Sequence, residues 1–381
     1  MGGNTLDFSP VVEYVESVLR KEKGVPGCDL KIMRGHETLL RYSSGTRDYE
    51  HIQPVHKDDM YLLFSCTKPI TCAAAMRLVE EGLISLDDPV SKYLPEFKNA
   101  YLLKDGKPVA PQNTMTIRHL FTMSAGFNYD RDTQPIRDVI AANPHAGTVD
   151  IIKALARSPL QFEPGSKFLY SMCHDVLAAV VEVVSGQRYS QYLKETIFDP
   201  LGMKDTTFHI TQAQKQRLAA VYLSPEEGIC NPYSMECDFK ITDSYESGGA
   251  GLYSTVDDYS LFADAMACGG VGITGKQILK PETIDLMRTE QLSNYAMDPR
   301  FGCAAGPGYG YGLGVRTLID QTCSRSSIGE FGWDGAAGAY VMIDPKYDLS
   351  IFFAMHVRGW PRLIGCGHAP IRDLTYQVLG L

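Results

Sequence analysis

Residues 62–75 read Leu-Leu-Phe-Ser-Cys-Thr-Lys-Pro-Ile-Thr-Cys-Ala-Ala-Ala, and Ser65 stands three positions before Lys68 where an apolar run passes into a predicted helix. Side chains at positions i and i+3 of a helix are neighbours, so the lysine amine can reach the serine hydroxyl. A serine becomes nucleophilic when a base takes its proton, and a lysine is such a base once its pKa falls toward neutrality. The helix dipole and the apolar neighbours of Lys68 both favour the neutral amine. The stretch therefore indicates a serine nucleophile with a lysine base.

The Ser-x-x-Lys pattern is short, and it also describes a serine that caps a helix beside a solvated lysine. It occurs once in this sequence, behind a run of residues typical of a buried strand. Because the pattern alone does not choose between these interpretations, the choice depends on the partners of Ser65 elsewhere in the chain.

Composition describes an ordinary globular protein. The chain has 381 residues, 44% of them hydrophobic and 21% charged, which suits one large domain or two closely packed ones. Its net charge of −9 argues against nucleic acid or an anionic membrane as a partner. No stretch reaches transmembrane length and the first residues do not read as a signal peptide, so we expect a cytoplasmic protein.

The ten cysteines show no Cys-x-x-Cys pair and no Cys/His spacing that fits a zinc site. We therefore expect reduced, mostly buried thiols and neither a metal nor a cofactor.

Hydrophobic periodicity predicts an α/β part built from both ends of the chain, residues 1–82 and 245–381, with a helical insertion at 83–244. The insertion consists of short helices between loops rich in proline and glycine, and residues 128–143 read as one of these loops. Helix 9–23 is expected to begin with Ser9 as its N-cap. Further helices are expected at 65–81, 256–268, 281–287 and 370–379, and strands at 28–33, 38–42, 61–64, 310–317, 339–343 and 349–356.

Six segments together carry a resemblance to a known family. They are Phe64–Lys68, Leu86–Pro95, Thr116–Leu120 with Ser124–Gly126, Pro164-Gly165 before Tyr170-Ser171, Gly251–Thr255 with Asp257-Asp258, and Gly332–Gly335. In this order they resemble the serine β-lactamase and penicillin-binding-protein superfamily, in particular the class C-like branch that includes the family VIII carboxylesterases. The resemblance implies a β-lactamase-like fold, an antiparallel sheet flanked by helices with an inserted all-helical domain.

Tyr170 is the expected partner of Lys68. A phenol whose pKa is lowered by a nearby lysine can carry a proton from the nucleophile to a leaving group. The resemblance implies that Lys68 and Tyr170 take the proton of Ser65 and later activate the deacylating water.

The second and third motifs depart from the β-lactamase pattern. Trp333 stands where relatives that recognise a substrate carboxylate carry lysine or histidine, and Met172 stands where β-lactamases carry asparagine. Both departures resemble family VIII esterases, as does Asp175 five residues after the tyrosine. Asp175 either stabilises the first turn of a helix or helps to set the protonation of Lys68 and Tyr170. With Gly335, these residues are the expected substrate-binding set.

The resemblance also implies an oxyanion hole made by the backbone N–H groups of Ser65 and Ala336, for which Gly335 leaves room. Aromatic residues such as Phe127, Tyr129, Tyr309, Tyr311 and Trp360 are candidates for the wall of an acyl pocket. There is no Gly-x-Ser-x-Gly, so the α/β-hydrolase alternative lacks its nucleophile.

The sequence thus predicts a serine hydrolase that cleaves small carboxylic esters through an acyl-serine. Three alternatives remain: a β-lactamase or D-amino-acid amidase or peptidase acting on amides, an acyltransferase, and a non-catalytic scaffold or filament. The expected partner is a small-molecule ester or amide, and the pattern leaves the oligomeric state open.

Overall fold

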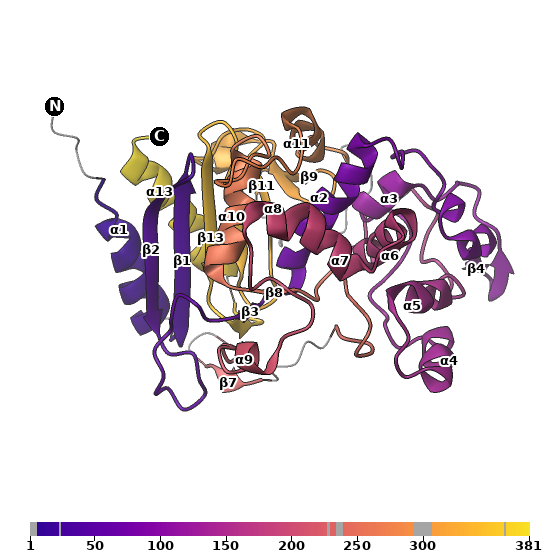
Figure 1. The fold of residues 1–381 in the computed structure, drawn as a ribbon, viewed down its shortest axis with the longest axis horizontal. Coiled ribbons are helices and arrows are strands. Elements are labelled where there is room, and N and C mark those ends of the chain that lie inside the picture. The colour runs from indigo at the N-terminus through magenta and orange to yellow at the C-terminus, as the bar shows by residue number, and fades with distance from the viewer. Residues whose placement is uncertain (1–5, 23, 227–228, 234–238, 293–306, 362) are drawn as a thin grey trace.

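The structure is a computed structural model that describes residues 6–22, 24–226, 229–233, 239–292, 307–361 and 363–381. A central sheet occupies one side of the molecule and a group of helices the other, with α2 (Thr67–Glu80) between them (Figure 1). The stretch around Ser65 and Lys68 therefore lies where the two parts meet.

The sheet has seven strands in the order β2-β1-β13-β12-β11-β10-β9, and every neighbouring pair is antiparallel. Its strands come from two parts of the chain, residues 27–45 and 309–354. They are β1 (Gly27–Arg34), β2 (Glu37–Gly45), β9 (Tyr309–Tyr311), β10 (Arg316–Leu318), β11 (Phe331–Asp334), β12 (Tyr340–Asp344) and β13 (Leu349–Ala354).

Helices cover both faces of this sheet. Side chains of a strand alternate between faces, and in β13 both sets are buried and, apart from Ser350, apolar. Ile351 and Phe353 pack with α1 (Ser9–Tyr14) and α13 (Ala369–Leu379), whereas Phe352 and Ala354 belong to the core that includes α10 (Val256–Ala267). Two buried faces require a layer on each side, so the architecture is helix, sheet, helix.

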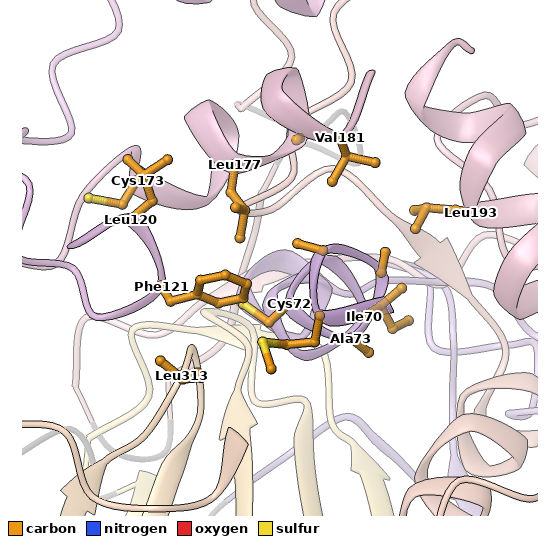
Figure 2. Close-up of a cluster of buried hydrophobic side chains, with 14 of the residues drawn as sticks. Ile70, Cys72, Ala73, Leu120, Phe121, Cys173, Leu177, Val181, Leu193 and Leu313 are labelled. Atoms are coloured by element: carbon orange, nitrogen blue, oxygen red, sulfur yellow. The ribbon is translucent and has the colours of Figure 1, made fainter. Parts of the chain in front are cut away.

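The helical region is organised around α6 (Cys173–Ser185), which packs against α2. Figure 2 shows Leu177 and Val181 of α6 on one side of α2 and Leu313, from the β9–β10 turn, on the other. The remaining helices of the region are α3 (Ile117–Phe121), α4 (Gln134–Ala142), α5 (Thr148–Leu155), α7 (Tyr189–Leu193), α8 (Asp199–Leu201) and α9 (Gln212–Lys215). One continuous core thus joins the helical region to the sheet through α2.

Smaller strand pairs connect the two regions. β3 (Tyr61–Leu62) pairs with β8 (Tyr253–Ser254), which brings the segment before β8 beside the start of α2. β6 (Tyr222–Leu223) pairs with β14 (Val357–Arg358), so the chain returns to the α/β part before the predicted boundary at residue 244. β6 also pairs with β7 (Asn231–Pro232), and β4 (Leu102–Lys104) pairs with β5 (Lys107–Val109). The helix α11 (Pro281–Met287) follows α10 in the chain.

Three local predictions are wrong for identifiable reasons. The expected strand 310–317 is a hairpin, because Gly314 has a φ of +86° and its Cα approaches Cys72 too closely for a side chain. The expected loop 128–143 contains α4, since Pro135 lies in the first helical turn where proline is tolerated. Phe8 rather than Ser9 precedes α1, and a π-helical segment continues it to residue 22.

The seven cysteines whose side chains are described are free thiols: Cys28, Cys66, Cys72, Cys173, Cys230, Cys268 and Cys323. Cys237, Cys303 and the side chain of Cys366 lie outside the described residues. None of the helices described here has the length and apolar character needed to cross a membrane.

Candidate active site

Ser65 lies in a tight turn between β3 and α2. Phe64 has a φ of +47°, a left-handed conformation that costs a bulky residue about 1–3 kcal/mol. Contacts from distant segments hold the turn: the Leu63 N–H donates to the Leu252 carbonyl at 2.9 Å, and the Tyr259 hydroxyl donates to the Cys66 carbonyl at 2.7 Å. The turn leaves Ser65 partly exposed, while Lys68 one helical turn later is fully buried.

The amine of Lys68 contacts the serine. Its Nζ lies 3.1 Å from Ser65 Oγ, 2.8 Å from Tyr129 Oη and 2.7 Å from the Gly249 carbonyl oxygen. Burial lowers the pKa of Lys68 to about 7, although the negative charge of Asp175 acts in the opposite direction. A buried amine with this pKa is a competent base for the hydroxyl beside it.

Tyr170 completes the group, with a protonation state that differs from the prediction. The Lys68 Nζ lies 4.5 Å from its ring centroid, and the Trp333 indole N–H donates to its hydroxyl at 3.0 Å. Burial raises the pKa of the phenol well above its usual value, although hydrogen bonds with Ser65 and Trp333 lower it. The expectation of a lowered pKa for this phenol is therefore wrong, because burial raises the pKa by more than these hydrogen bonds lower it. Tyr170 keeps its proton at neutral pH.

The third motif, Gly332–Gly335, lies directly beside the turn at Ser65. The Cys66 thiol contacts the Trp333 carbonyl at 3.7 Å, and a Cβ on Gly335 would lie 2.4 Å from the Leu63 carbonyl oxygen. Only glycine permits this approach. Ala336 follows in an exposed turn after β11. The structure thus brings the predicted oxyanion-hole segment next to Ser65.

Asp175 and Met172 lie behind the site rather than on its surface. The Asp175 carboxylate is 2% exposed and accepts hydrogen bonds from Tyr245 Oη at 2.7 Å and Ser247 Oγ at 2.6 Å. It stands in the first turn of α6, and its charge raises the pKa of Lys68, so both roles left open by the sequence fit its position. Met172 is 1% exposed and packs in the main core. Both side chains are buried, whereas Ser65 is partly exposed, and their place in the substrate-binding set stays a prediction.

The segment Gly248-Gly249 also belongs to the site, since the Gly249 carbonyl contacts Lys68, and sequence reasoning did not identify it. A Cβ on Gly249 would lie 2.7 Å from Asp175 Oδ2 and 3.2 Å from Tyr129 Oη, so this position needs glycine. The Thr71 hydroxyl fastens the segment to α2 through the Gly248 carbonyl at 2.6 Å. The adjacent pair Gly248-Gly249 was a signal of close backbone approach. Tyr129 was predicted only as a candidate for the wall of an acyl pocket, not as a partner of Lys68.

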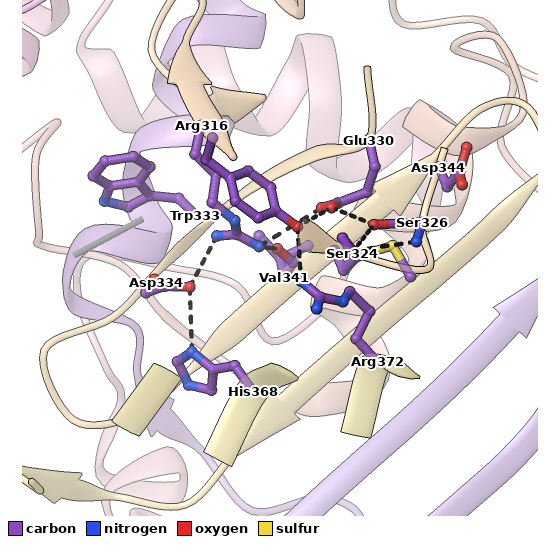
Figure 3. Close-up of polar contacts among 12 residues, drawn as sticks. Arg316, Ser324, Ser326, Glu330, Trp333, Asp334, Val341, Asp344, His368 and Arg372 are labelled. Carbon is purple, nitrogen blue, oxygen red and sulfur yellow. Dashed lines mark hydrogen bonds and ion pairs between the residues drawn. The ribbon is translucent and has the colours of Figure 1, made fainter. Parts of the chain in front are cut away.

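A buried network of charges surrounds β11, the strand that carries Trp333 and Asp334 (Figure 3). Arg316 donates to Asp334 at 2.9 Å and to the Val341 carbonyl at 2.9 Å, and its guanidinium lies 3.9 Å from Glu330. Burial raises the pKa of Asp334, but the charge of Arg316, helped by His368, outweighs it and leaves the pKa below its usual value. Arg316 therefore fixes the strand that carries Trp333.

Among the described residues, one group of three side chains could hold a metal ion: His36, Asp264 and Cys268. None of them belongs to the site around Ser65.

Comparisons with known proteins extend over nearly the whole chain. The family model Beta-lactamase matches residues 12–365. Protein Rv1367c of Mycobacterium tuberculosis is 30% identical over 389 residues, which cover 93% of this chain and 97% of that protein. Esterase EstB of Burkholderia gladioli is 29% identical over 404 residues, covering 98% and 97% of the two chains.

The solved structures include that of EstCE1, described as a hydrolase with promiscuous acyltransferase activity. It matches this structure with a TM-score of 0.78 and 27% identity, and the match covers 96% of this chain and 98% of EstCE1.

Proposed function

The chain belongs to the β-lactamase family, and from this premise we propose that it hydrolyses small carboxylic esters through an acyl-Ser65 intermediate. The likeness to EstB and to EstCE1 favours a hydrolase of this type over an amide-specific one. The observation that carries the proposal is the buried Lys68 amine, 3.1 Å from the Ser65 hydroxyl and with a pKa of about 7.

Acylation begins when neutral Lys68 takes the hydroxyl proton of Ser65 and Oγ attacks the ester carbonyl carbon. The carbonyl oxygen becomes an oxyanion, which the N–H groups of Ser65 and Ala336 stabilise. The C–O bond to the alcohol then breaks. The leaving alkoxide receives the proton of Tyr170, and the lysine ammonium restores that proton to the phenol.

Deacylation repeats these steps with water. Neutral Lys68 takes a proton from a water molecule, whose oxygen attacks the acyl carbon. The bond to Ser65 then breaks, Oγ receives the proton of Tyr170, and the lysine ammonium returns a proton to the phenolate. The products are a carboxylic acid and the regenerated hydroxyl. The Trp333 N–H donates a hydrogen bond to the Tyr170 hydroxyl at 3.0 Å and so keeps the phenol in position in both half-reactions.

Trp333 also bears on the choice of substrate. An indole offers one N–H and an apolar face, and in this structure its N–H is already directed at Tyr170. A β-lactam or a D-alanyl peptide carries a carboxylate, and at the position of Trp333 this chain has no lysine or histidine to bind it. This favours uncharged esters.

The test is p-nitrophenyl butyrate hydrolysis by the wild type and by Ser65→Ala at matched concentrations. Esterase activity in the wild type that is lost in the variant is the expected result. Activity that survives would mean that Ser65 is not the nucleophile. Faster turnover of nitrocefin or a D-alanyl amide would favour the amidase, and inactivity with no labelling of Ser65 by a fluorophosphonate would favour a scaffold.

Acyl transfer to an alcohol is the second candidate, favoured by the likeness to EstCE1. It uses the same acyl-Ser65 and differs in the nucleophile that removes the acyl group. Partitioning of product toward an added alcohol, at concentrations where water remains in large excess, would identify it.

A further inference from the structure

We propose that His36, Asp264 and Cys268 form a binding site for a zinc-type divalent cation at the C-terminal end of α10. Nitrogen, oxygen and sulfur donors of the three side chains lie within 4.8 Å of one another. The set combines an imidazole, a carboxylate and a thiol, which zinc accepts together in four-coordinate sites, with water in the fourth position.

The distances are close to those that a metal requires. His36 Nδ1 lies 2.7 Å from Asp264 Oδ2, and Cys268 Sγ lies 3.9 Å from Asp264 Oδ1. Donor atoms around a tetrahedral zinc ion are separated by about 3.3–3.6 Å. Small movements of side chains would therefore form the site. As the sulfur–metal bond forms, the thiol proton passes to solvent.

Two rigid elements carry the donors. His36 stands in the two-residue turn between β1 and β2, where Gly35 and His36 have φ values of +56° and +70°. Asp264 and Cys268 are four residues apart at the end of α10, so their side chains share one face. The His36 N–H also donates to Asp264 Oδ1 at 3.1 Å, which fixes the turn against the helix.

The charge of the cluster favours a cation. Asp264 is fully buried, and the ion pair described for it is with His36, a residue that is neutral unless protonated. A buried carboxylate without a permanent positive partner is costly. A divalent ion would supply that charge.

The site is open to solvent and separate from the catalytic group. Cys268 lines a surface groove of about 610 Å³ together with Asp348, and the His36 side chain is 34% exposed. In the N-terminal half of the same helix, Tyr259 holds the Cys66 carbonyl. An ion at the other end of α10, which packs against β1 (Figure 1), would join the β1–β2 turn to the helix without touching Ser65.

The test is a titration of chelator-treated protein with Co²⁺, whose thiolate complexes absorb in the near ultraviolet. We expect one equivalent to produce a sulfur-to-cobalt band in the wild type. Cys268→Ser should abolish the band, and His36→Ala should weaken Co²⁺ binding on the order of tenfold or more.

Cys323→Ser is the matched control. The Cys323 thiol also lies 3.9 Å from a carboxylate oxygen, that of Asp320, but it belongs to no described group with a histidine. This variant should keep the band. The proposal would be overturned if the wild type showed no sulfur-to-cobalt band, or if Cys268→Ser kept the band.

Thermal unfolding gives a second readout that does not depend on catalysis. Zn²⁺ at about a hundred times its Kd should raise the Tm of the wild type and of Cys323→Ser by about 2 °C or more. Asp264→Asn keeps an acceptor for the His36 N–H but loses the anion, and should show no such rise. An equal rise in Asp264→Asn would contradict the site even if the Cys268 variant fails to fold.

Discussion

The amine nitrogen of Lys68 lies 2.8 Å from the hydroxyl oxygen of Tyr129, closer than the 3.1 Å that separates it from Ser65 Oγ. Burial raises the pKa of Tyr129 well above its usual value, so this phenol stays neutral. A neutral hydroxyl accepts a hydrogen bond from an ammonium and donates one to an amine. Tyr129 can therefore hold Lys68 in place in both protonation states.

Tyr129→Phe tests this role. Without the hydroxyl, the amine is held less firmly against Ser65, and we expect kcat on p-nitrophenyl butyrate to fall about 10- to 100-fold with little change in Tm. Tyr101→Phe is the control, since its hydroxyl donates to the Arg157 carbonyl at 3.2 Å away from the site. Equal activities of the two variants would remove Tyr129 from the mechanism.

The pH dependence should follow Lys68. Below its pKa the lysine is an ammonium and cannot take the serine proton, so kcat/KM should rise with pH through about 7. The charge of Asp175 favours the ammonium, and Asp175→Asn should therefore move this rise to lower pH. Initial rates between pH 5 and 9 measure both profiles. A shift of the variant profile to higher pH would contradict the assignment.

Trp333→Phe separates the indole N–H from the aromatic ring. Loss of one hydrogen bond to the Tyr170 hydroxyl, worth about 1 kcal/mol, should lower kcat roughly fivefold to tenfold. Trp360→Phe is the control. Trp360 packs in the core beside α1 and α13 and not, as expected, with Trp333, and its buried N–H has no hydrogen-bond partner among the described residues. The comparison of kcat with KM for both variants shows whether Trp333 acts on the tyrosine or only on substrate binding.

Arg316→Met should destabilise the fold rather than change the chemistry directly. It leaves Asp334 and Glu330 buried without their shared cation, which costs about 3–5 kcal/mol. Arg137→Met removes an exposed pair with Asp132 and should cost less than about 1 kcal/mol. Urea unfolding of both variants gives the two values, and similar losses would mean that the network contributes little.

Much of the fold could be read from the sequence because its signals are local. The apolar period of strands and helices recovered the sheet elements from both chain ends, and motif order placed Ser65, Lys68 and Tyr170 together. The β9–β10 turn was missed because Gly314 lies against Cys72, more than two hundred residues earlier in the chain. The alternation of apolar residues within one segment carries no information about a contact with a residue so far away in the chain.

The site shows the same limit. Ser65 and Lys68 lie one helical turn apart, so their contact follows from spacing. Tyr129 is predicted only as a possible wall of an acyl pocket, and its contact with Lys68 depends on tertiary packing. The same holds for the Gly249 carbonyl, although the adjacent glycines indicate a close backbone approach. The pKa of Tyr170 was predicted in the wrong direction because the sequence shows the neighbouring lysine but not the amount of water that burial removes.

The left-handed Phe64 has a consequence for the newly synthesised chain. The turn at Ser65 is held by Leu252 and Tyr259 and lies against Trp333, all of which leave the ribosome long after it. A nascent chain that already displays Ser-x-x-Lys still lacks the partners that keep Phe64 in its costly conformation. We therefore expect the turn at Ser65 to take its folded shape only after Trp333 has been synthesised, and a peptide copied from residues 62–75 not to reproduce it.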